Sequence, residues 1–509
     1  MTHRSIKTRR RDLLKTAATV AAMNAAPLQA QSRTSARPHI LLLMADQFRG
    51  DCLGADGNRV VRTPNLDRVA AEGARFRCAY SSTPTCTPAR SALLTGLAPW
   101  NHGMLQMVAM AARYPTEKPR AMREAGYHTA VIGKNHYHTQ RNGHGYRQML
   151  LDESGRVETP DFRSDYRSWF WSVAPNLDPD ATGLGWNDYR ARPYALPESL
   201  HPTAWIGQTA VKFIETYSRP EPMFLKVSFE RPHSPYDPPE RFWRMYADAD
   251  LPAAQCGKWA AKYAPRSGTD DDIWHGDVGQ AEVRNSRRGY YGSISFVDEQ
   301  IGRILESLEK RRLLEETLIL FVSDHGDMTG DHHLWRKSYA YEPSARIPLL
   351  LRWPAGMLSA KRGQVLGQTV ELRDILPTFL DAAGAAARPE LDGRSLLPLI
   401  QGKTEGWRPY LDLEHGICYS PQNHWNALTD GREKYIYHAY DGTEQFFDLE
   451  RDPHELSDLA SDAAASRRVA DWRERMLAHL APRGEAYVKN GRLIPRPQNM
   501  PRSPNFPAA

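Results

Sequence analysis

The chain has 509 residues, of which 41% are hydrophobic and 25% are charged, and its formal net charge is +6 at pH 7. This length exceeds what one hydrophobic core usually supports, so we expect a large domain and a smaller one. Residues 1–30 contain six Lys or Arg and one Asp and therefore carry most of the net charge. The nearly neutral remainder argues against a nucleic-acid-binding surface, which requires clustered positive charge.

The first 30 residues are typical of an export signal. The sequence Arg-Arg-Asp-Leu-Leu-Lys at residues 10–15 resembles the twin-arginine signal. The weakly apolar stretch after it, residues 16–26, is shorter than the roughly 20 residues that a membrane span needs. We therefore expect cleavage near Ala30 and a periplasmic or secreted protein without a membrane span. The alternative is a basic amphipathic helix that lies on a membrane surface.

Five short apolar runs along the chain predict buried strands. They cover residues 39–46, 129–133, 223–229, 317–324 and 347–352. Helical patterns lie between them, at residues 65–72, 121–125, 203–216 and 289–313. This alternation predicts an α/β fold with a mostly parallel central sheet and helices on both faces. Ligands of such sheets collect at the carboxyl ends of the strands, where Asp46 and Asp324 lie.

The pattern changes towards the end of the chain. Short alternating segments at residues 434–437 and 445–449, followed by a helical stretch at 463–480, predict a small antiparallel sheet and one helix. We accordingly place a catalytic domain at 38–405 and a C-terminal α+β subdomain at 406–485. Residues 486–509 are rich in proline and are expected to be extended or disordered.

The five cysteines show no spacing typical of a zinc site, and we expect free thiols. One of them begins the sequence Cys86-Thr87-Pro88-Ala89-Arg90, which resembles the maturation signature of the type I sulfatases, in the alkaline phosphatase-like superfamily. In that family a formylglycine-generating enzyme oxidises the cysteine to formylglycine, whose hydrate is the catalytic nucleophile. A structural cysteine beside a turn-forming proline is the alternative interpretation. The preceding residues 63–67 (Thr-Pro-Asn-Leu-Asp) also resemble the family and favour the modified cysteine.

The resemblance implies one divalent metal ion with ligands at two strand ends. The ligands would be Asp46, Gln47, Asp324 and His325, completed by the modified residue 86. Oxygen donors of this kind suit Ca²⁺. The family more often has Asp and Asn where Gln47 and His325 stand, and a nitrogen ligand moves the preference towards Mn²⁺. Either aspartate, taken alone, could instead cap a helix.

A second family signature spans residues 126–136, where Gly-Tyr-His-Thr leads through a strand to Gly-Lys-Asn-His. The resemblance implies that Lys134 neutralises charge near the ester and that His136 accepts a proton from the second hydroxyl of the aldehyde hydrate. The alternative is a surface lysine and a histidine satisfied by neighbouring groups. The length of the pattern favours the catalytic interpretation.

Three further residues are expected at the site by resemblance. His233, between two prolines after the third strand, would contact the sulfate and protonate the departing alcohol. Lys337 resembles the second active-site lysine, and Arg90 would also neutralise charge. Asn101 and His102 either line the substrate pocket or form a turn.

These expectations lead to one main function and two alternatives. The main one is a sulfuric ester hydrolase that acts on an aryl sulfate or on a sulfated saccharide. Because of Gln47 and His325, a phosphonate monoester or phosphodiester hydrolase with the same nucleophile is an alternative. The third is a non-catalytic binding protein that retains the fold.

Overall fold

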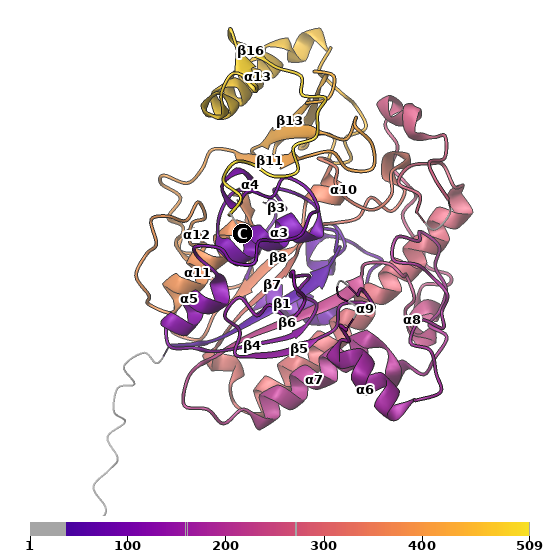
Figure 1. Cartoon of the computed structure of the whole chain (residues 1–509), viewed down its shortest axis with the longest axis vertical. Helices are drawn as coiled ribbons and strands as arrows, with labels where there is room; N and C mark the ends of the chain where they lie inside the picture. Colours follow the sequence, from indigo (N-terminus) through magenta and orange to yellow (C-terminus); the bar gives the residue numbers. More distant parts are fainter. Residues whose placement is uncertain (1–36, 158, 160, 270–271, 508–509) are drawn as a thin grey trace, which may run out of the picture. The chain divides into compact units, whose positions relative to one another are not determined.

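The computed structural model describes residues 37–157, 159, 161–269 and 272–507. The chain from Pro38 onward forms one compact unit, shown in Figure 1. The expected export signal at residues 1–30 lies outside the described residues. Within the described part, none of the helices has the length and apolarity to cross a lipid bilayer.

The unit is built around an eight-stranded sheet with the strand order β5-β4-β6-β1-β7-β8-β2-β9. Its strands are β1 (His39–Asp46), β2 (Ala74–Phe76), β4 (His128–Gly133), β5 (Gln148–Leu151), β6 (Met223–Pro232), β7 (Thr317–Ser323), β8 (Leu349–Arg352) and β9 (Gln364–Leu366). Strands β5, β4, β6, β1 and β7 run parallel to one another. The predicted α/β fold with a mostly parallel sheet is therefore confirmed.

The direction of β8 is the exception. It pairs antiparallel with β7, and Val322 at the end of β7 lies opposite Leu349 at the start of β8. The connecting residues 324–348 contain only the short helical turns η5 (Asp331–His333) and α10 (Glu342–Ala345). Because this connection contains no long crossover helix, the chain re-enters the sheet at the end of the strands where β7 left it. The next strand, β8, therefore runs antiparallel to β7.

Helices cover both faces of the sheet (Figure 1). Along β1, Ile40, Leu42 and Met44 belong to one apolar core, whereas the alternate residues belong to the other, as the two-residue period of a strand requires. The first core includes α3 (Cys86–Thr95), α5 (Lys118–Glu124) and α11 (Ile375–Ala382). The second includes α2 (Pro64–Ala71), α7 (Pro202–Thr216) and α9 (Gln280–Lys310).

Helix α9 begins nine residues before its predicted start. Its first turns bury one apolar side chain, Val283, beside the polar Ser286 and Arg287, so the apolar period becomes visible only later. The Arg287 guanidinium donates a hydrogen bond of 2.6 Å to Asp331. Ion pairing, together with the packing of Val283 in a small core with Tyr189 and Trp335, therefore fixes this end of the helix.

The C-terminal part forms a four-stranded antiparallel sheet, and the sequence predicted a small antiparallel sheet in this region. Its strands are β11 (Leu411–His415), β12 (Trp425–Thr429), β13 (Glu433–His438) and β14 (Glu444–Asp448). The first two were not predicted. Helix α13 (Ser466–Leu480) packs on this sheet through Trp472 and other apolar residues. The remaining elements are β3 (Ala79–Tyr80), α4 (Pro99–His102), α6 (Asp165–Val173), α8 (Glu240–Met245), β10 (Val370–Glu371), α12 (Leu397–Ile400), β15 (Val488–Lys489) and β16 (Arg492–Leu493).

The last described residues of the chain lie against the segment that follows α4. The backbone N–H of Ser503 donates to the carbonyl of Gly103 (2.9 Å), and Arg502 forms an isolated bridge with Met104. Gly103 has φ 86°, and a Cβ there would lie 2.3 Å from the backbone of Phe506. Only glycine therefore allows the tail to approach α4, beside which Figure 1 places the C-terminus.

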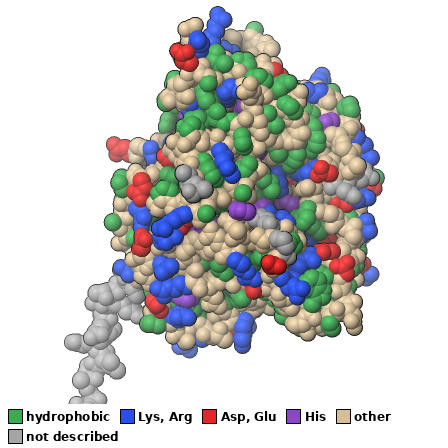
Figure 2. Space-filling model, in the orientation of Figure 1, with side chains coloured by type: hydrophobic (Ala, Val, Ile, Leu, Met, Phe, Trp, Pro, Cys, Tyr) green, Lys and Arg blue, Asp and Glu red, His purple; other side chains and the backbone are tan. Residues whose placement is uncertain are grey.

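The surface carries both signs of charge. On the face shown in Figure 2, Lys and Arg side chains are interspersed with Asp and Glu. None of the five cysteines, all in the described part of the chain, forms a disulfide, as expected for the four other than Cys86.

A buried lysine links the C-terminal sheet to the residues before β8, and we predict that it is essential for stability. Lys434 donates to Ala340 O, Glu342 Oε1 and Glu455 Oε1 over 2.8–2.9 Å. Lys434→Met would leave two carboxylates without their buried partner, so we expect a loss of about 3–5 kcal/mol in the free energy of unfolding. Urea unfolding followed by circular dichroism measures it.

The control for this variant is Arg432→Met. Arg432 pairs with Glu450 on the exposed surface, where both side chains are more than half accessible, so its urea midpoint should not change. Equal midpoints for Lys434→Met and the unmodified protein would show that the buried link does not stabilise the fold.

Candidate active site

The expected site residues lie where parallel strands of the sheet end. Asp46 is the last residue of β1, and Asp324 directly follows the neighbouring β7. Lys134 directly follows β4, and His233 directly follows β6. Because these strands are parallel, their carboxyl ends meet at one edge of the sheet. Sequence positions up to 278 residues apart thus converge in space.

Four of the expected ligands form one buried cluster. A ligand atom from each of Asp46, Cys86, Asp324 and His325 lies within 4.8 Å of the others, and all four side chains are inaccessible to solvent. The Cys86 Sγ atom lies 3.2 Å from His325 Nε2 and 3.9 Å from Asp46 Oδ1. Cys86 is the first residue of α3, which presents it to the strand ends.

The ligand chemistry of this cluster fits a divalent cation. His325 Nδ1 lies 2.9 Å from the carbonyl of Gly326, which can only accept, so Nδ1 carries a hydrogen and Nε2 is the ring atom that faces the cluster. Two carboxylates and one imidazole suit Mn²⁺ as well as Ca²⁺. Asp46, Asp324 and His325 could therefore hold a metal ion together with residue 86.

Two cationic side chains pair with the carboxylates of the cluster. Arg90 donates to Asp324 Oδ2 (2.8 Å) and to Asp46 Oδ2 (3.1 Å), and Lys134 Nζ lies 2.5 Å from Asp46 Oδ2. Burial opposes ionisation of Asp46, but Lys134 and the other cations outweigh it, so its pKa lies well below the usual range. Ionised oxygens are what a metal ligand requires.

Lys337 joins the nucleophile position to His233. Its Nζ atom lies 3.4 Å from Cys86 Sγ and 2.7 Å from His233 Nε2. His233 Nδ1 donates to the carbonyl of Ser234, so Nε2 accepts from Lys337. Burial, and then the charge of Lys337, hold the pKa of His233 well below its usual value, and the ring is neutral at pH 7.

The thiol of Cys86 is more acidic than an ordinary buried thiol. Burial and the Asp46 carboxylate raise its pKa, but Lys337, His325 and Lys134 together outweigh them, so the net shift is downward. The surroundings of residue 86 therefore stabilise negative charge at this position.

Gln47 lies at the edge of the cluster. Its Oε1 atom accepts from Lys337 Nζ (2.9 Å), and its Nε2 donates to Asp327 Oδ2. The Tyr290 hydroxyl donates to its carbonyl over 2.6 Å and holds the backbone at φ 66°. Asp327, which also accepts from Tyr236, was not expected at the site. The sequence feature that could have indicated Asp327 is its position three residues after Asp324, in the same loop.

His136 lies outside the metal cluster. Its Nε2 accepts from Arg156 Nη1, and its backbone N–H donates to Glu153 Oε1 (3.0 Å). Burial and then Arg156 lower its pKa well below the usual value. Among the described residues no hydrogen bond joins His136 to Cys86, and the Nδ1 atom has no partner. No motif in the sequence indicated Glu153 or Arg156.

Trp186 forms a wall beside these groups. Its ring centre lies 5.2 Å from Lys134 Nζ and 5.2 Å from the His233 ring. Of the two residues with open roles, Asn101 is exposed and donates to Asp392. His102 is fully buried, accepts from the N–H of Met104, and has its pKa lowered to about 3 by burial. Both side chains are thus used in local structure around α4.

Comparison with known proteins places this geometry in a family. The model of the sulfatase family matches residues 38–385, and that of the C-terminal part of N-sulphoglucosamine sulphohydrolase matches residues 330–481. An arylsulfatase of Clostridium perfringens is 37% identical and covers 90% of this chain and 97% of its own length. A choline-sulfatase of Rhizobium meliloti is 33% identical over 84% of this chain and 83% of its own.

A solved structure agrees with this assignment. The phosphonate monoester hydrolase of Agrobacterium radiobacter superposes with a TM-score of 0.74 at 29% identity and covers 89% of this chain and 98% of its own. The sequence matches extend over the strands, the metal cluster and the C-terminal sheet. The chain therefore belongs to the sulfatase family and is a sulfuric ester hydrolase.

Proposed function

We propose that the protein releases sulfate from sulfate monoesters with a formylglycine nucleophile made from Cys86 and with one bound divalent metal ion. The observation that carries the proposal is the position of Cys86. It begins α3 within one buried cluster of two carboxylates and one imidazole, next to Lys337. A structural cysteine would not need ionisable neighbours of this kind.

Asp46, Asp324 and His325 would hold the metal ion, with Gln47 at the edge of the site. We propose Ca²⁺, with Mn²⁺ as the alternative that the imidazole favours. When bound, the ion supplies positive charge that stabilises the charge developing on the ester oxygens. The hydrated aldehyde supplies the attacking oxygen and, through its second hydroxyl, a route for sulfate to leave.

The cationic side chains divide into two roles. A sulfate monoester is an anion, so the site must offset the repulsion of an approaching nucleophile. Lys337 and Lys134 have side-chain amines directed at the cluster and would contact the sulfate oxygens. Arg90 is already engaged with Asp46 and Asp324, so it positions the ligands instead.

Proton transfer follows from the hydrogen bonds. His233 Nε2 accepts from Lys337 Nζ, so the pair can pass a proton from the lysine through the imidazole to the departing alcohol oxygen. His136 is proposed to accept the proton of the second hydroxyl. In the present arrangement Arg156 occupies its Nε2 atom, so this step requires that Arg156 move away.

We further propose that residues 1–30 direct twin-arginine export to the periplasm, and that a formylglycine-generating enzyme modifies Cys86. The substrate class is an aryl sulfate or a sulfated saccharide. Phosphonate or phosphodiester hydrolysis is the second candidate, favoured by Gln47, His325 and the structural likeness to a phosphonate monoester hydrolase. Turnover of 4-nitrophenyl sulfate compared with a phenylphosphonate ester ranks the two.

The first prediction concerns Cys86. In protein from the native host, the peptide that contains it should have the mass of the aldehyde and not of the thiol. Cys86→Ala should lower turnover of 4-nitrophenyl sulfate by at least about a thousandfold. Cys86→Ser should perform only the first half of the reaction, the attack on sulfur. It should therefore accumulate a covalently sulfated serine, which mass spectrometry detects. Cys256→Ala, an exposed cysteine, is the control, and normal turnover by Cys86→Ala would refute the assignment.

A second prediction tests the leaving-group proton. His233→Ala should lower kcat/KM about 10²–10⁴-fold for an alkyl sulfate, whose alcohol leaves poorly without a proton. The loss should be much smaller for 4-nitrophenyl sulfate, since nitrophenolate leaves unaided. His454→Ala, an exposed histidine, should affect neither substrate. Equal losses on both esters would show that His233 does not protonate the alcohol.

A third prediction concerns the metal ion. Removal with a chelator should abolish activity, and Ca²⁺ or Mn²⁺ should restore it. Gln47→Asp replaces an amide by a carboxylate and should move the preference towards Ca²⁺. Gln401→Asp, at an exposed position, is the control. If the Ca²⁺/Mn²⁺ ratio of restored activity is the same with Gln47→Asp, Gln47 is not a ligand.

A further inference from the structure

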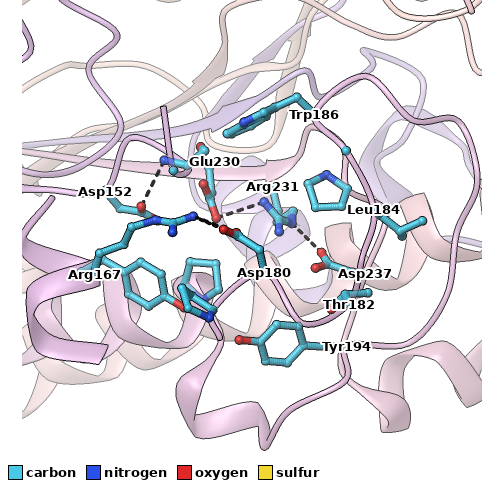
Figure 3. Close-up of a pocket in the computed structure, with 17 residues that line it drawn as sticks. Asp152, Arg167, Asp180, Thr182, Leu184, Trp186, Tyr194, Glu230, Arg231 and Asp237 are labelled. Atoms are coloured by element: carbon cyan, nitrogen blue, oxygen red, sulfur yellow. Dashed lines mark hydrogen bonds and ion pairs between the residues drawn. The ribbon is translucent and has the colours of Figure 1, made fainter. Parts of the chain in front are cut away.

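We propose that a cavity beside Trp186 binds a protonated primary amine carried by the alcohol part of the sulfate ester. This inference rests on the proposed function and specifies its substrate class. The cavity has a volume of about 190 Å³ and lies at the ends of β5 and β6. Figure 3 shows its lining, with Trp186 at one end and Glu230 next to it.

The cavity is acidic. Four carboxylates and two guanidinium groups line it, and no lysine or histidine does so: Asp152, Asp180, Glu230 and Asp237 face Arg167 and Arg231. Arg231 is neutralised by Glu230 Oε1 (3.0 Å) and Asp237 Oδ1 (2.8 Å). Arg167 is bound by both oxygens of Asp180 over 2.6–2.7 Å. After this pairing the excess charge of the lining is negative.

Two buried acceptor oxygens in this lining have no partner. Asp152 Oδ1 accepts from the N–H of Ser154 (3.1 Å), but its Oδ2 accepts nothing. Glu230 Oε2 is likewise unpaired, and the two residues are only 0% and 2% exposed. Burial, and next the charge of Glu230, raise the pKa of Asp152 well above its usual value, so this carboxyl retains its proton until a cation beside it stabilises the ionised form. Unpaired buried carboxylate oxygens are rare and costly, so this pair is suited to a cationic donor.

The chemistry of the lining selects the kind of cation. The unpaired oxygens require N–H donors, which a primary ammonium group has and a quaternary one lacks. A divalent metal ion requires several converging ligands, and in the described part of the chain only the cluster at Asp46 meets that condition. The rings of Tyr166, Tyr194 and Trp186 complete the walls and would contact the carbon skeleton of the amine.

The position of the cavity links the amine to the ester. Glu230, Arg231 and Pro235 line the cavity, while His233, in the same segment of chain, contacts Lys337 at the reaction centre. Trp186 lines the cavity too, and its ring lies 5.2 Å from both Lys134 Nζ and the His233 ring. One molecule can therefore place its ammonium group in the cavity and its sulfate at Cys86 if it passes the indole. An amino sugar sulfate has this form.

The test compares two esters that differ only in one group, D-glucosamine 6-sulfate and D-glucose 6-sulfate. We expect kcat/KM for the amine to exceed that for the neutral sugar by about tenfold or more, as a buried charged hydrogen bond does. Glu230→Gln and Asp152→Asn should each bring this ratio close to one. The control is Asp248→Asn, which removes an exposed carboxylate outside the cavity and should keep the ratio. An unchanged ratio in Glu230→Gln overturns the proposal.

A binding measurement separates this proposal from the proposed function. In calorimetry with the full-length protein, D-glucosamine should bind and D-glucose should not, and Glu230→Gln should abolish the binding. If the protein hydrolyses 4-nitrophenyl sulfate but does not bind glucosamine, the amine site is wrong while the sulfatase mechanism stands. If glucosamine binds through Glu230 but Cys86→Ala retains turnover, the amine site stands and the proposed nucleophile is wrong. Binding of Ca²⁺ at the cavity in place of the amine would also overturn the proposed amine site.

Discussion

The site depends on the balance of buried charge around Asp46 and Asp324. Two carboxylates held a few ångströms apart without solvent repel each other and would take up protons. Arg90 bridges them, and Lys134 supplies a second positive charge. Because Arg90 and Cys86 share one helical turn of α3, the arginine that holds the two carboxylates also fixes the position of Cys86 beside them. The spacing of four residues between Cys86 and Arg90 thus has a structural reason.

The parallel sheet makes this arrangement possible. Neighbouring strands β1 and β7 deliver Asp46 and Asp324 side by side, and β4 and β6 add Lys134 and the segment that contains His233. The residues that complete the site come from the long connection between β7 and β8. Since β8 returns at the same edge, this connection remains over the strand ends and brings Lys337 to Cys86.

Sequence alone predicted the strand ends well because apolar runs and their polar termini are local patterns. The proximity of Asp46 to Asp324 requires in addition that their parallel strands be neighbours, as β1 and β7 are. The contact of Lys337 with His233 could not be predicted from such local patterns, because both residues lie in loops whose paths depend on tertiary contacts. The acidic cavity was missed because β5, the strand that Asp152 follows, was not predicted, so its proximity to Glu230 near the end of β6 was not visible. The early start of α9 was hidden by the polar side chains that it buries.

The complete burial of Cys86 has a consequence for the order of events during synthesis. Thr85, the preceding residue, hydrogen-bonds Ser338 and His415, which lie 253 and 330 positions later in the chain. The segment around the thiol cannot reach its final arrangement until the ribosome has made those residues. In the finished fold the thiol has no accessible surface, so another protein can reach it only before the chain has folded around it.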